Sequence, residues 1–99
     1  MSFYLKDPGA ILDYAVDWGA EYLDGDVIIE SRFAVAPVEP GGAEITATTF
    51  DDKVTVVTVG GGVAGHQYSL VNHVVMQSGR EDERTIVLRV EQRGCWWRE

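Results

Sequence analysis

The chain has 99 residues, of which 45% are hydrophobic, 10% aromatic and 24% charged. This length suits one small domain and excludes a (β/α)8 barrel or a two-half dinucleotide-binding fold. Sixteen acidic against eight basic residues give a formal net charge of -8, and eleven of the acids lie in residues 1–52. Because an acidic surface repels phosphate backbones and anionic lipid, neither nucleic acid nor a membrane surface is an expected partner.

The sequence also indicates where the protein is made. The single cysteine, Cys95, cannot form an intramolecular disulfide. The start, Met1–Pro8, lacks the basic and apolar segments of a signal peptide, and no apolar run approaches the roughly 20 residues of a membrane span. We therefore expect assembly in a reducing cytoplasm.

The first predicted strand is Leu12–Trp18, because large apolar residues alternate there with aspartates. The wider segment Pro8–Leu23 could instead be partly helical, since apolar residues also recur in it at helical spacing. After the Asp24–Asp26 turn, Val27–Val35 is rich in β-forming residues. Ile28 and Ile29 are adjacent within it, and a bulge would reconcile them with one inward face.

The rest of the chain continues as short strands between glycine- and proline-rich turns. The further predicted strands are Glu44–Phe50, Lys53–Val59, Gln67–Met76 and Arg84–Glu91. Short strands at this spacing indicate an all-β fold, an antiparallel immunoglobulin-like (fibronectin-III-like) β-sandwich of about seven strands. We assign residues 1–93 to this domain and 94–99 to a C-terminal tail.

Tyr68 lies at the start of a predicted strand, after the glycine-containing loop Val63–Gly65. In Greek-key sandwiches a tyrosine at this place returns its hydroxyl to upstream backbone, the arrangement known as a tyrosine corner. The alternative is an ordinary core tyrosine, and both interpretations concern architecture rather than activity.

No residue pattern predicts catalysis, a cofactor or a metal. Gly60–Gly65 matches the spacing of a dinucleotide-binding loop, but a strand rather than a helix is predicted after it. His66, His73 and Cys95 do not have the spacing of a zinc site, and the paired aspartates do not fit a calcium-binding loop. An enzyme is therefore not expected.

The C-terminal tail is the sharper functional signal. Trp96 and Trp97 are adjacent and flanked by Arg93 and Arg98. Tryptophan and arginine are enriched at interface hot spots, so we predict that these four residues contact a partner, together with Trp18. The alternative is that one tail tryptophan folds back on the edge of its own sandwich.

Three segments give a resemblance to a known family: Leu5–Trp18, Asp24–Ile28 and Gly79–Ile86. In this order they resemble the small virion proteins of tailed bacteriophages that are described as fibre–tail adaptors. The resemblance spans Leu5 to about Arg93. It implies a structural protein of the tail or head–tail connector and no catalytic residues.

We therefore expect a non-enzymatic adaptor in the virion, which links connector, tail or fibre proteins and itself forms a multi-copy ring. A carbohydrate- or surface-binding module of the same fold is the alternative, with Trp18, Trp96 or Trp97 stacking on sugar rings. An intracellular regulatory binder is a third possibility, because fold alone does not fix function.

Overall fold

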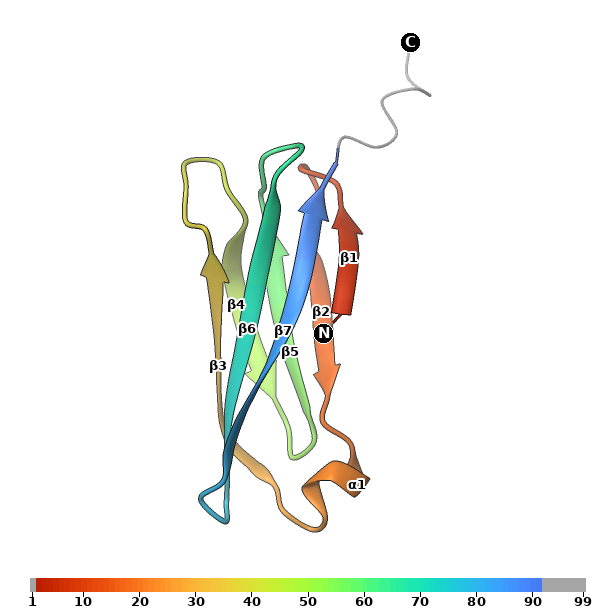
Figure 1. Cartoon of the computed structure of the whole chain (residues 1–99), viewed down its shortest axis with the longest axis vertical. Helices are drawn as coiled ribbons and strands as arrows, with labels where there is room; N and C mark the ends of the chain where they lie inside the picture. The colour runs from red at the N-terminus through yellow and green to blue at the C-terminus, as the bar shows by residue number, and fades with distance from the viewer. Residues whose placement is uncertain (1, 92–99) are drawn as a thin grey trace.

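The computed structural model describes residues 2–91, which form two β-sheets packed face to face (Figure 1). The elements are β1 (Ser2–Lys6), β2 (Leu12–Asp17), α1 (Ala20–Leu23), β3 (Ile28–Ala36), β4 (Glu44–Phe50), β5 (Val54–Gly60), β6 (Gln67–Met76) and β7 (Glu81–Val90). The predicted all-β sandwich of about seven strands is confirmed. The predicted domain boundary at residue 93 lies outside the described residues. Within residues 2–91, no helix is long and apolar enough to cross a membrane.

The strand order is β1-β7-β6-β3 in one sheet and β2-β5-β4 in the other. The three-stranded sheet and the β7-β6-β3 group follow the order of an immunoglobulin constant-type domain. β1 departs from that order, because it pairs parallel with β7 instead of joining the sheet that contains β2. As a result β1 and β2 are the edge strands on the same side of the sandwich (Figure 1).

The core lies between the sheets and is formed by alternate residues of the strands. In β6 every second residue from Tyr68 to Met76 is buried, as the alternation in the sequence predicts. In β5 the inward residues are Thr55, Val57 and Val59, so Val54 and Val56 face outward. Thr55 tolerates this position because its hydroxyl has a buried partner, the side chain of Asn72.

Three segments differ from the sequence prediction. β1 was not predicted, because its apolar residues Phe3, Tyr4 and Leu5 follow one another without alternation and the buried residue of the strand is a lysine, Lys6. β7 begins at Glu81 rather than Arg84, since residues 81–83 pair with the end of β6. In the segment Pro8–Leu23, the strand prediction is confirmed over Leu12–Asp17, and the helix is limited to Ala20–Leu23.

The bulge expected at Ile28 and Ile29 is present. The pairing of β3 with β6 shifts register between Ile28 and Glu30. Ile28 is buried, whereas Ile29 is exposed. The extra residue thus places one isoleucine in the core and lets Phe33 and Val35 pack against the core further along the strand.

Candidate interaction surface

Trp18 is a core residue, so its prediction as a partner contact is wrong. Its side chain is only 1% exposed, and its Nε1–H donates to the Oδ1 of Asn72 over 3.2 Å. The Arg84 guanidinium covers the ring, with its central carbon 4.2 Å from the ring centroid. The indole therefore has no free face for a partner or a sugar.

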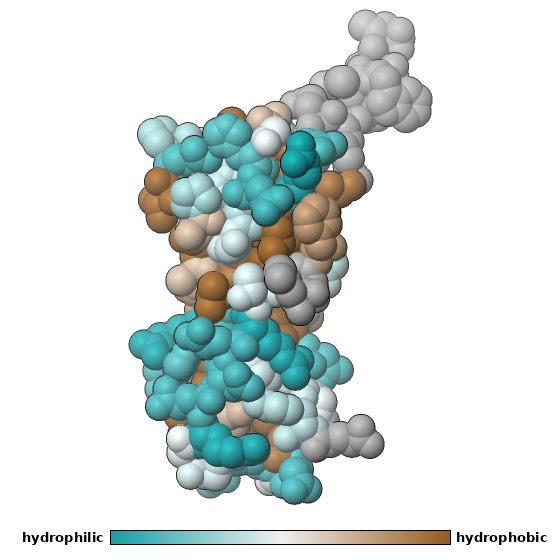
Figure 2. Space-filling model, viewed as in Figure 1, coloured by the Kyte–Doolittle hydropathy of each residue, from teal (hydrophilic) through white to brown (hydrophobic). Residues whose placement is uncertain are grey.

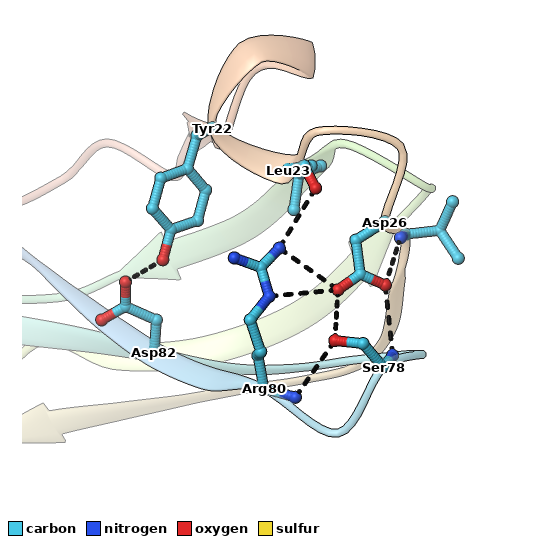
Figure 3. A network of polar contacts seen from close by, with 7 residues as sticks. Tyr22, Leu23, Asp26, Ser78, Arg80 and Asp82 are labelled. Atoms are coloured by element: carbon cyan, nitrogen blue, oxygen red, sulfur yellow. Dashed lines mark hydrogen bonds and ion pairs between the residues drawn. The ribbon is translucent and has the colours of Figure 1, made fainter.

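A cluster of polar side chains around Asp26 joins the turn after α1 to the β6–β7 hairpin (Figure 3). The Asp26 carboxylate accepts hydrogen bonds from the Ser78 hydroxyl over 2.6 Å and from the Arg80 guanidinium over 3.2 Å. Arg80 also donates to the Leu23 carbonyl over 3.1 Å. These hydrogen bonds lower the pKa of Asp26, and the bond from the Ser78 hydroxyl has the largest effect.

Beside this cluster the Tyr22 hydroxyl donates to the Asp82 carboxylate. The bond raises the pKa of Tyr22 and lowers that of Asp82. The polar groups at this end of the sandwich thus bind one another. We assign them a structural role, which is to hold α1 against β7.

At the opposite end, Tyr68 forms the backbone contact that the sequence analysis expects of it. Its hydroxyl accepts a hydrogen bond from the Val63 N–H over 3.0 Å and donates to the Glu39 carboxylate. The Nδ1 of His66 lies 2.9 Å from the same carboxylate. The bonds from Tyr68 and His66 lower the pKa of Glu39, and burial together with Glu39 raises that of Tyr68.

The glycine-rich loop Gly60–Gly65 packs tightly between neighbouring segments. The buried Lys6 ammonium donates to the Gly61 carbonyl over 2.6 Å and to the Asp7 carbonyl over 3.0 Å. Burial lowers the pKa of Lys6, and the Asp7 carboxylate opposes this shift. Since β6, and no helix, follows the loop, phosphate binding does not explain its glycines. Close packing explains Gly61 and Gly62, and a positive φ explains Gly65.

His73 lies on the outer face of the four-stranded sheet, between two carboxylates of β7. Its Nε2 is 2.8 Å from Glu81 Oε1, and its Nδ1 is 3.0 Å from Glu83 Oε2. The bonds to Glu83 and Glu81 raise the pKa of His73. Among residues 2–91, no group of three or more His, Cys, Asp or Glu side chains is arranged to hold a metal ion.

The edge strand β1 exposes apolar side chains and no charge. Phe3 is 59% exposed and Leu5 is 43% exposed, while the single charged residue of the strand, Lys6, is buried. Natural edge strands usually resist pairing with other chains by means of exposed charges. The opposite edge of this sheet, β3, has such charges in Glu30 and Arg32, and β1 does not.

Exposed apolar residues at the start of the neighbouring strand β2 extend this region. The Tyr4 ring contacts the Tyr14 ring of β2, with centroids 5.1 Å apart, which places the two strands side by side. We define the β1–β2 edge by its exposed apolar residues, Phe3, Tyr4, Leu5, Ile11 and Leu12. Apolar surface is visible over β1 on one side of the molecule (Figure 2). This edge was not anticipated from the sequence, because the residue pattern predicts no strand before residue 12.

The remaining predicted contact residues, Arg93, Trp96, Trp97 and Arg98, lie outside the described residues. Their role in partner binding therefore stays a prediction. The last described residue, Glu91, donates its N–H to the Lys6 carbonyl over 2.9 Å, so the described part of the chain ends beside the end of β1.

The comparisons with known proteins point to one family. The sequence model of the family described as podophage GP4 fiber-tail adaptor protein gp77 matches residues 6–89. The matched range includes β2 to β6, α1 and nearly all of β7. No curated protein matches the chain.

Proposed function

The chain belongs to the podophage GP4 fibre–tail adaptor family, and we propose that it links specific virion proteins as one subunit of a multi-copy ring. Its role in this proposal is structural and non-enzymatic. The partners are further copies of the chain and connector, tail or fibre proteins. Assembly takes place in the host cytoplasm.

The observation that supports this proposal is the β1–β2 edge. An exposed apolar edge strand without charges is a template for pairing with another chain, and a soluble protein normally keeps it covered. Full burial of an exposed Phe or Leu side chain contributes about 1.5–3 kcal/mol. Phe3 and Leu5 are about half exposed, so each can contribute about half of that on contact with a partner. A small subunit can thus form a firm assembly when the same modest contact repeats around a ring.

The charge distribution favours complementary contacts between unlike surfaces. Residues 1–52 contain eleven acids and two bases, whereas residues 53–99 contain five acids and six bases. Charge complementarity mainly sets orientation and association rate, and apolar burial supplies affinity. A head-to-tail contact between an acidic and a neutral region is compatible with a closed ring.

No observation favours the carbohydrate-binding alternative. A sugar-binding tryptophan needs an exposed ring face, and the ring of Trp18 is covered by Arg84 and by the core. The two other tryptophans lie outside the described residues. We therefore keep only the adaptor proposal.

The test is the solution mass of the pure full-length chain by light scattering, followed by co-purification with tail and fibre proteins of the same phage. We expect a defined oligomer well above the 10.9 kDa of one chain. In the Phe3→Lys/Leu5→Lys variant this oligomer should dissociate. The control Ile29→Lys/Val38→Lys adds the same charge at two exposed apolar sites away from the edge and should leave the assembly intact.

A monomeric chain that binds no virion protein would overturn the proposal. An oligomer that survives the substitutions in β1 would keep the adaptor role but remove the β1–β2 edge from the subunit contact.

A further inference from the structure

We infer that the β1–β2 edge receives residues 92–99 of a neighbouring copy, which add to β1 as a further strand. This inference rests on the proposed multi-copy assembly and names the segment that occupies the contact. Three properties of the edge and the segment support it.

The first property is the match between adjacent tryptophans and a two-sided apolar edge. Neighbouring residues of a strand point to opposite faces, so an added strand presents Trp96 to one face and Trp97 to the other. Phe3 and Leu5 lie on the outer face of the four-stranded sheet. Tyr4 faces the other way, toward β2, where its ring contacts Tyr14. Each indole thus meets apolar side chains, which a one-sided patch could not provide.

The second property is the position from which the segment starts. Glu91 is hydrogen-bonded to the carbonyl of Lys6, the last residue of β1. To pair with its own β1, the segment would have to cross that strand, about 10 Å or two strand spacings, and then reverse direction. The crossing and the turn use about half of the eight residues. A neighbour's edge accepts the whole segment.

The third property is charge. Residues 92–99 contain two bases, Arg93 and Arg98, and one acid, whereas residues 1–91 contain six bases and fifteen acids. Asp13 and Asp17 are exposed on β2, beside the acceptor edge, and neither carboxylate forms an ion pair with another described residue. The basic segment and the acidic flank of the edge are complementary. Donor and acceptor are different surfaces, which is the condition for a ring of head-to-tail contacts.

Two full-length variants test the pairing by complementation. The donor variant, Trp96→Ser/Trp97→Ser, keeps its edge, and the acceptor variant, Phe3→Lys/Leu5→Lys, keeps its tail. Each alone should have the mass of one chain by light scattering. An equimolar mixture should contain a complex of two chains, because one intact tail and one intact edge remain.

The native Cys95 provides a second measurement that separates a neighbour's tail from the chain's own. In a Leu5→Cys variant, mild oxidation should yield covalent dimers and higher oligomers on a non-reducing gel. The control variant Ile29→Cys places its thiol at an exposed site on β3 and should yield none above background. An internal disulfide without a gain in mass would show that the tail folds back on its own chain, and this outcome would overturn the inference.

The other outcomes are equally decisive. Variants that each keep the wild-type oligomeric mass would overturn the tail-to-edge contact while leaving the multi-copy adaptor intact. Monomeric variants that form no complex on mixing, together with equal crosslinking of the two cysteine variants, would also overturn it. A wild-type chain that is itself monomeric would remove the ring on which the inference rests.

Discussion

Thr55 of β5 and Asn72 of β6 connect the two sheets through a hydrogen bond of 2.6 Å inside the core. Asn72 is completely buried, and its Oδ1 also accepts from the Trp18 indole. Its Nδ2 donates to the Ser31 hydroxyl and to the Arg32 carbonyl, each over 3.0 Å. All four hydrogen-bonding positions of the amide are thus used, so this polar group fixes the alignment of the sheets without an unsatisfied atom.

Replacement of Asn72 should destabilise the fold far more than replacement of its partner. Asn72→Ala leaves a cavity and removes the partner of the Trp18 N–H and of the Arg32 carbonyl, for an expected loss of about 3 kcal/mol or more. Thr55→Val keeps the volume and removes one hydrogen bond, for a loss of about 1 kcal/mol. Urea unfolding measures both. Equal losses would contradict the central role of the amide.

The strand that contains Asn72 shows what the sequence could predict. The alternation from Gln67 to Met76 predicted both the strand and the inward face to which Asn72 belongs. The partners of Asn72 could not be predicted, because they lie 17 to 54 residues away along the chain. A local pattern determines which face is buried, whereas the contact across the core depends on how the two sheets pack.

β1 shows the opposite case. Its inward residues include Lys6, and its exposed residues include Phe3 and Leu5. The charged side chain is thus buried and the apolar ones are exposed, which is the reverse of the usual pattern. The ammonium of Lys6 can be buried only because the backbone carbonyls of Gly61 and Asp7 accept hydrogen bonds from it. Neither the geometry of that loop nor the parallel pairing of β1 with β7 produces a recognisable local pattern in the sequence. The candidate edge was therefore not predictable from the residues alone.

Gly62 of the glycine-rich loop should not tolerate replacement by alanine without a loss of stability. Its φ is +114°, and a Cβ at this position would lie 2.6 Å from a methyl carbon of Val90. Gly62→Ala therefore adds a steric clash to the backbone strain, for an expected loss of about 3 kcal/mol. Thermal unfolding measures the change.

Gly65→Ala is the matched control for this substitution. Gly65 also has a positive φ, +87°, but its Cβ would meet no atom within 4 Å. The backbone strain alone should cost about 1–2 kcal/mol. If both variants unfold at the same temperature, close packing against Val90 is not the reason for the glycine.

The carboxylate of Asp26 should make stability depend on pH in the acid range. Its pKa is lower in the folded chain than in the unfolded chain. The stabilisation is therefore fully present above the unfolded pKa of about 4 and is lost as the pH falls through the folded value. In urea unfolding, the difference between the wild type and Asp26→Asn should be largest near neutral pH and shrink below about pH 4.

Asp24→Asn corrects this comparison for the change in net charge. Asp24 has a positive φ of 51°, which asparagine adopts as readily as aspartate, and its exposed side chain makes no hydrogen bond to another described residue. The loss of stability in Asp24→Asn should stay small over the whole pH range. If the two variants follow the same pH profile, the bonds from Ser78 and Arg80 do not stabilise the fold.

The pKa of His73 should lie above the ordinary histidine value of 6.5. Both ring nitrogens lie within hydrogen-bond distance of carboxylates, and only the charged imidazolium can donate a hydrogen bond from each nitrogen. A raised pKa means that its stabilisation is present below pH 6.5 and is lost as the pH rises through the folded value. Titration of the ring C–H resonances by NMR measures this pKa directly.

The groups around His73 allow the cause of this shift to be tested. Glu81→Gln/Glu83→Gln should return the pKa toward 6.5, because neutral amides no longer favour the charged ring. Arg32, which faces the ring from β3, has the opposite influence, and Arg32→Gln should raise the pKa further. A wild-type value at or below 6.5 would mean that the two carboxylates do not hold His73 in its charged form, and that desolvation and Arg32 dominate instead.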